Sequence, residues 1–165
     1  MPMKDNKMVS KVSVDDVNIF FESAFPDDPP PNIASGDVKE GSDTRPKVLV
    51  MEEGRSVIRM NISARNKRPG NYISGPTQMG LADQIAYAVI FTQLGIVPMA
   101  VTSNLNMNFL RPCIGSALLG EGRMIKLGRT LAVIEVEIRA ENETGEPSDK
   151  VASHAIVTYA IPQAG

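Results

Sequence analysis

The chain of 165 residues has no tryptophan, one cysteine (Cys113) and one histidine (His154). A single cysteine excludes an intrachain disulfide, and so few thiol and imidazole groups predict no metal site. No apolar run approaches the roughly 18 residues of a membrane-spanning helix, and the first residues lack the apolar core of a signal peptide. These absences predict a cytoplasmic protein without a metal and without a membrane partner.

Positively and negatively charged residues are nearly equal in number. Lysine and arginine number 17 and aspartate and glutamate 19, which gives a net charge of -2. No basic stripe with interleaved aromatic residues is present, so the sequence predicts no nucleic-acid partner. The length and the 42% hydrophobic content suit one globular domain with an extension.

One long segment is almost free of charge. Between Arg68 and Arg111, 42 residues contain a single charged side chain, Asp83. A lone carboxylate among apolar residues is costly to bury, and it persists where it performs chemistry or pairs with a partner. Asp83 is therefore either a general base or nucleophile, or a carboxylate that pairs with an arginine such as Arg111 at a subunit contact or faces water.

The pattern of apolar residues predicts two unequal parts. Residues 1–46 combine a short helix, which Ser13 would cap and Pro26 would end, with a proline-rich linker. Residues 47–165 form the folded domain. Its expected elements are a hairpin over 48–51 and 56–64, a largely buried helix from Pro76 to Leu94 capped by Gly95, and strands over 101–109, 116–126, 130–141 and 151–161. This order predicts an α+β fold in which about six antiparallel strands wrap round one long helix.

Polar residues gather at two places near Asp83. Ser74 and Gly75 would present backbone N–H groups at the helix N-terminus, as an oxyanion site requires, or would only cap the helix. Gly75 precedes Asp83 by about 12 Å of helix axis, so the two would contact one extended substrate or serve separate places at a dimer interface. Alternation along the strand also predicts a polar face, either a hydrogen-bonding wall or a solvated surface, formed by Thr102, Asn104, Asn106 and Asn108.

Three separated motifs resemble one known family. They are the segment 68–83, the segment 102–112, and Lys126-Leu-Gly-Arg129 before a Val-Ile-Glu-Val-Glu strand. Together they resemble the hotdog-fold acyl-CoA thioesterases of the phenylacetate-pathway (PaaI-like) type, over about Val48 to Pro162. The resemblance implies a helix inside a curved sheet, subunits paired edge to edge as a homodimer or homotetramer, and active sites at the dimer interface.

The resemblance also implies roles for single residues. Asp83 matches the family's catalytic acid and Gly75 its oxyanion glycine, while Ser74 and Pro76 replace a histidine and a second glycine of the family motif. Thr102 matches the residue that helps to hold the attacking water, contributed by the partner subunit. Substrate or coenzyme A contacts are expected from Asn71, Gln78, Met79, Asn104, Arg111, Lys126, Gly128 and Arg129. No cofactor is expected, because coenzyme A is part of the substrate.

The leading functional hypothesis is hydrolysis of an acyl-CoA thioester. Asp83 would activate water or attack directly, and the Gly75 N–H would stabilise the oxyanion. The alternative is a non-catalytic acyl-CoA-binding hotdog protein, which the altered motif around Gly75 favours. A hydratase or dehydratase ranks last, because such enzymes use a histidine and His154 lies outside the helix motif, in a strand where it would pack or hydrogen-bond.

Overall fold

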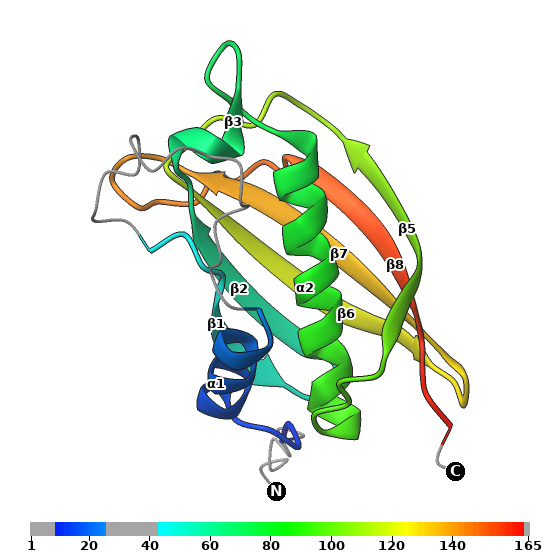
Figure 1. Ribbon diagram of the computed structural model, residues 1–165. Coiled ribbons are helices and arrows are strands. Elements are labelled where there is room, and N and C mark those ends of the chain that lie inside the picture. Colours follow the sequence, from blue (N-terminus) through cyan, green and yellow to red (C-terminus); the bar gives the residue numbers. More distant parts are fainter. Residues whose placement is uncertain (1–8, 26–42, 164–165) are drawn as a thin grey trace, which may run out of the picture.

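The computed structural model describes residues 9–25 and 43–163 (Figure 1). In chain order the elements are α1 (Val14–Ala24), β1 (Lys47–Glu52), β2 (Arg55–Asn61), a 3-10 turn (Ala64–Asn66), β3 (Lys67–Arg68), β4 (Tyr72–Ile73), α2 (Gly75–Leu94), β5 (Val101–Phe109), β6 (Ala117–Leu127), β7 (Leu131–Glu141) and β8 (Ser153–Ala160). Six of the strands form one antiparallel sheet in the order β1-β2-β6-β7-β8-β5. The sheet curves round α2, which confirms the predicted hotdog fold.

Helix α2 is the centre of the core, and local chemistry sets both of its ends. Ser74 is the N-cap, Pro76 lies in the first turn, and Gly95 ends the helix with a positive φ of 81°. The helix begins at Gly75, one residue before the predicted start. Buried residues occupy every side of it between Leu81 and Thr92, because the sheet encloses one face and α1 covers part of another.

Two glycines of β6 let α2 approach the sheet closely. A Cβ atom built on Gly122 would lie 2.5 Å from Cγ2 of Ile85 and 2.8 Å from Cγ2 of Val89, and one built on Gly120 would collide with Cδ1 of Ile85. Both α2 side chains are fully buried, so they have little room to move. The distance between α2 and β6 therefore depends on the absence of side chains at these two positions.

The first prediction tests this close approach. Gly122→Ala should lower the free energy of unfolding by about 1–3 kcal/mol, because the added methyl group overpacks a dense core. Gly80→Ala is the control, since Gly80 lies on the exposed side of α2 with no atom within 4 Å of a built Cβ, and alanine there should be neutral or stabilising by up to about 1 kcal/mol. Urea unfolding of both variants measures the difference; equal effects would contradict the packing constraint.

Helix α1 packs against the β1 edge of the sheet. The Ser13 and Asp16 side chains form a reciprocal capping box at its start. Asn18 donates from Nδ2 to the Val48 carbonyl over 3.1 Å and accepts from the Val48 N–H over 2.9 Å. Phe21 is buried in the same core as α2. The predicted helix is confirmed, whereas residues 26–42 of the predicted linker lie outside the described residues.

The strand predictions agree with the structure to within one or two residues, apart from the end of β2, and three short elements were not predicted. Strand β2 ends at Asn61, because the chain turns there into the 3-10 turn and the β3–β4 hairpin. Within residues 9–25 and 43–163, no helix has both the length and the apolar character needed to cross a membrane.

The prediction of a polar face on β5 is wrong for one residue, Thr102. The register with β8 shifts between Thr102 and Asn104, which is the mark of a β-bulge. Asn108 pairs with His154, whose ring contacts Glu135 on the outer face of the sheet, whereas Thr102 turns inward to α2. The extra residue therefore reverses the alternation, and Thr102 does not share a face with the three asparagines.

Candidate active site

Asp83 lies on α2 and is held by two hydroxyl groups. The Thr102 hydroxyl donates to its Oδ1 over 2.5 Å, and the Tyr159 hydroxyl donates to the same oxygen over 2.8 Å. Tyr159 also lies 3.1 Å from the backbone carbonyl oxygen of Asp83. Among the described residues, Oδ2 of Asp83 accepts no hydrogen bond and no cation pairs with the carboxylate. One oxygen is therefore fixed and the other is left available.

The two donors reach Asp83 from neighbouring strands at one edge of the sheet. Thr102 of β5 and Tyr159 of β8 are direct partners in the ladder. Tyr159 lies on the buried face of β8, and the bulge in β5 turns Thr102 toward α2 as well. Thr102 thus contacts Asp83 of its own chain, whereas the resemblance had implied a contribution from the partner subunit. Arg111 follows the far end of β5 and does not pair with Asp83 within one chain. The alternative that the two residues pair at a subunit contact stays a prediction.

Tyr159 is the residue of this cluster that the sequence analysis missed. Its side chain is 4% exposed, and burial raises its pKa above the ordinary value. The Thr102 hydroxyl opposes this rise in pKa, and the charge of Asp83 adds to it by a smaller amount. The phenol consequently remains a protonated donor. A usable sequence signal was that Tyr159 shares one face of the predicted strand with Ala155 and Val157, because a tyrosine on an apolar strand face needs a partner for its hydroxyl.

The N-terminus of α2 lies at the other end of β5. A Cβ built on Gly75 would lie 3.3 Å from Cζ of Phe109. As the first helical residue, Gly75 has an N–H group without an acceptor inside the helix. The Ser74 hydroxyl accepts from the Thr77 N–H over 3.3 Å and lies 2.8 Å from the Thr77 hydroxyl, so Ser74 acts as the helix cap.

The second prediction follows from this cap. Ser74→Ala should lower the free energy of unfolding by about 1 kcal/mol, because the Thr77 N–H loses its acceptor. Ser74→Asn keeps a side-chain acceptor at the N-cap and should restore most of the stability. Thermal unfolding of the two variants beside the native chain provides the measurement; an equal loss in both would show that capping is not the role of this side chain.

Three of the expected binding residues surround the start of α2. Asn71 has a positive φ of 64° at the tip of the β3–β4 hairpin and accepts from Nζ of Lys67 over 2.9 Å. Gln78 is buried and donates from Nε2 to the Ile73 carbonyl over 3.1 Å, while its Oε1 is buried without a partner. Met79 is 39% exposed on the helix surface. Asn71 and Gln78 therefore lie near Gly75, whereas Met79 lies one helical turn from both Gly75 and Asp83.

The remaining expected binding residues fall at separate places. Lys126, Gly128 and Arg129 lie at the β6–β7 turn, where the Gly128 N–H donates to the Leu131 carbonyl over 2.8 Å. Arg111 lies at the opposite end of the sheet, and Asn104 faces outward from β5. One chain therefore does not bring these side chains together. Within the described residues, no three His, Cys, Asp or Glu side chains gather as metal ligands.

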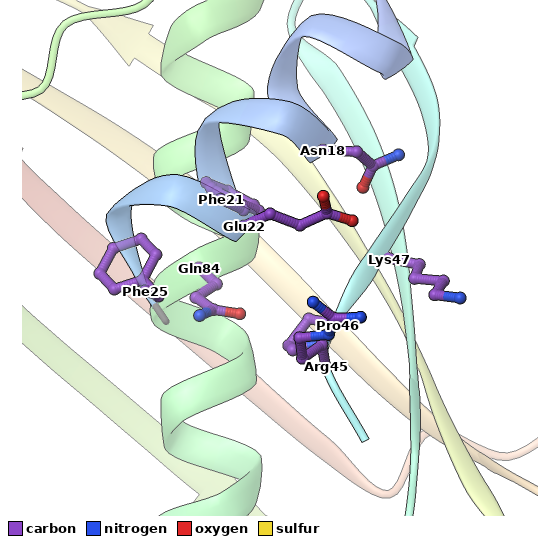
Figure 2. A pocket seen from close by; sticks show the side chains of 8 residues that line it. All are labelled: Asn18, Phe21, Glu22, Phe25, Arg45, Pro46, Lys47 and Gln84. Atoms are coloured by element: carbon purple, nitrogen blue, oxygen red, sulfur yellow. The ribbon is translucent and has the colours of Figure 1, made fainter. Parts of the chain in front are cut away.

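A cavity of about 240 Å³ lies between α1, the start of β1 and α2 (Figure 2). It is lined by Asn18, Phe21, Glu22, Phe25, Arg45, Pro46, Lys47 and Gln84. Gln84 extends into it from α2, and the buried Oε1 of this side chain has no hydrogen-bond partner. The cavity lies toward the β1 edge of the sheet, whereas the donors to Asp83 come from the β5 edge. It is therefore separate from the Asp83 cluster.

Comparison with known proteins shows similarity to thioesterases in sequence and fold. The sequence model of the thioesterase superfamily matches residues 70–146, which include both Gly75 and Asp83. A "putative thioesterase" from Silicibacter sp. TM1040 superposes with a TM-score of 0.73 at 29% identity, over 95% of this chain and 96% of that chain. The chain is therefore a hotdog-fold relative of the thioesterase superfamily. The PaaI protein of the Escherichia coli phenylacetic acid degradation operon, at 20% identity and a TM-score of 0.60 over 72% of this chain and 80% of that chain, shares this hotdog fold.

Two archaeal proteins are similar in sequence to this hotdog chain. A "putative esterase" from Saccharolobus solfataricus is 28% identical over 56% of this chain and 66% of its own length. Another from Thermoplasma acidophilum is 27% identical over 54% of this chain and 67% of its own length. The chain thus spans about two thirds of the length of these curated relatives.

Proposed function

We propose that the protein is a thioesterase that hydrolyses acyl-CoA esters, with Asp83 as general base or nucleophile. The observation that carries the proposal is the carboxylate with one oxygen fixed by two hydroxyls and the other free of partners among the described residues. A thiolate is a good leaving group, so one oriented carboxylate and one oxyanion donor suffice for the reaction. The similarity to thioesterases supports the choice of a thioester.

A homodimer would complete this site. Strand β5 is nine residues long, forms the edge of the sheet and is exposed along most of its length; Val101 is 58% and Phe109 49% exposed. A long open edge with apolar side chains readily pairs with another strand. Pairing with β5 of a second copy would satisfy the unpaired backbone groups and cover both apolar ends.

Antiparallel pairing of the two β5 strands would also join the separated halves of the site. In one chain Asp83 contacts Thr102 at the start of β5, while Gly75 lies against Phe109 at its end. A twofold axis near the middle of the strand sets the start of one strand beside the end of the other. Asp83 would then face the oxyanion donor Gly75 of the partner subunit.

The same twofold symmetry would bring basic residues of two chains toward one coenzyme A. The cations Lys126 and Arg129 lie at the end of the sheet where β5 begins, and Arg111 lies where β5 ends. In the dimer, Arg111 of the partner subunit would approach the end that carries Lys126 and Arg129. Basic groups from two chains would thus meet the phosphates of one coenzyme A, as charge-assisted contacts require.

The third prediction concerns the carboxylate. Asp83→Asn should reduce release of free thiol from a panel of aryl and aliphatic acyl-CoA esters by at least about 10²-fold, because an amide neither accepts the proton of water nor attacks a thioester. Asp15→Asn, which changes an exposed carboxylate of α1, is the matched control and should keep native turnover. Cys113 is buried and its pKa is raised to about 11, so its own thiol adds little background to the assay of released thiol.

If the native chain binds coenzyme A esters without turnover, the result would favour the alternative of a non-catalytic acyl-CoA-binding protein.

The fourth prediction concerns the dimer. With the axis at Leu105, residue 104 of one strand lies opposite residue 106 of the other, so the double substitution Asn104→Lys, Asn106→Lys sets like charges against each other. We expect monomers in analytical ultracentrifugation and loss of thiol release. The matched double substitution Asn104→Lys, Asn106→Glu sets opposite charges against each other and should keep both the dimer and the release of thiol. A fully active monomer would contradict the composite site.

A further inference from the structure

We propose that Tyr159 is the positioning residue of the catalytic carboxylate, and that its hydroxyl and that of Thr102 hold Oδ1 of Asp83 so that Oδ2 faces water or the thioester. The inference rests on the proposed function, because Tyr159 acts only through Asp83. None of the three sequence motifs contains this residue, which lies in the last strand of the sheet.

The hydrogen bonds restrict the carboxylate in a specific way. The phenol oxygen lies 2.8 Å from Oδ1 and 3.1 Å from the backbone carbonyl oxygen of the same aspartate. One hydroxyl that bridges the backbone and the side chain of Asp83 limits rotation about both side-chain bonds of that residue. Thr102 adds a second donor to Oδ1 at 2.5 Å, which leaves Oδ2 as the oxygen able to meet a reactant.

The phenol hydroxyl is itself held in place by packing. The ring of Tyr159 stacks on that of Tyr87 with centroids 5.7 Å apart and an interplanar angle of 12°, and Tyr87 stacks in turn on Phe21 of α1. Only 4% of Tyr159 is exposed, so a substrate in solution does not reach it. Its hydroxyl therefore has a fixed position before any substrate binds, which is the condition for preorganisation.

No cation among the described residues pairs with the Asp83 carboxylate in place of the two hydroxyls. Asp83 has no ion-pair partner within residues 9–25 and 43–163, so neutral hydroxyls alone stabilise the ionised carboxylate. Burial keeps the phenol protonated, as its raised pKa indicates, so its hydroxyl stays a hydrogen-bond donor to Asp83. Each hydrogen bond to a carboxylate favours its charged form.

The fifth prediction tests Tyr159→Phe, which removes one oxygen and keeps the stacked ring. We expect kcat to fall about tenfold or more with little change in KM, because a hydrogen bond to a charged group is lost. The acid limb of the pH dependence of kcat/KM should move to higher pH, since the charged carboxylate is less stabilised. Tyr87→Phe is the matched control: its hydroxyl donates to the Pro98 carbonyl over 2.9 Å, and its removal should change neither quantity.

Asp83→Asn, measured in parallel, separates failure of this inference from failure of the proposed function. If that variant keeps native turnover, the proposed function fails and the role of Tyr159 falls with it. If that variant is inactive but Tyr159→Phe keeps native kcat and the native acid limb, only the role of Tyr159 is overturned. A lower kcat with an unmoved acid limb would also overturn it, because a merely structural role has that effect.

A second measurement keeps the hydroxyl group of Tyr159 and changes only its acidity. The chain has three tyrosines, so a Tyr72→Phe, Tyr87→Phe background leaves Tyr159 alone for replacement by 3-fluorotyrosine during expression. The fluorinated phenol is more acidic and donates a stronger hydrogen bond, so the acid limb should move to lower pH. An acid limb that stays at its original pH would overturn the inference even if Tyr159→Phe fails to fold.

Discussion

The close contact between α2 and the middle of the sheet is the constraint on which the other features depend. Gly120 and Gly122 leave room on β6 for the fully buried side chains of Ile85 and Val89. Those two side chains fix the depth and rotation of the helix within the curved sheet. Asp83 lies beside this contact on the helix, so its carboxylate is directed to the β5 edge. The position of the Asp83 carboxylate at the β5 edge therefore depends on a packing contact in the core.

The edge strand β5 has two roles in the structure. Strand β5 is long and open, and it also carries Thr102, which holds Asp83. A bulge at the start of the strand reconciles these roles, because it turns Thr102 inward while the asparagines that follow face outward. Under the proposed function, the open edge is the surface that a second copy completes, and the bulge prepares each chain's half of the site.

The fold was predictable because its signals are local. Ser13 and Ser74 mark the helix starts, Gly95 marks the end of the long helix, and apolar alternation marks the strands, so most elements agree with expectation to within one or two residues. The short β3–β4 hairpin was not predicted, since two-residue strands carry no period. The face of Thr102 was predicted wrongly, because a bulge is invisible to a rule of strict alternation.

The sequence by itself determined the element order and an α+β fold with antiparallel strands round one long helix, and it singled out Asp83 as a candidate site residue. Helix caps, apolar periodicity and a lone charge are all local features of the sequence. Only the tertiary structure decided which groups surround that carboxylate. Tyr159 is 76 residues from Asp83, and strand pairing with Thr102 brings its hydroxyl to the helix. It also placed Gly75 and Asp83 against opposite ends of β5, at Phe109 and Thr102. Such distances arise when a sheet closes round a helix, and no local pattern encodes them.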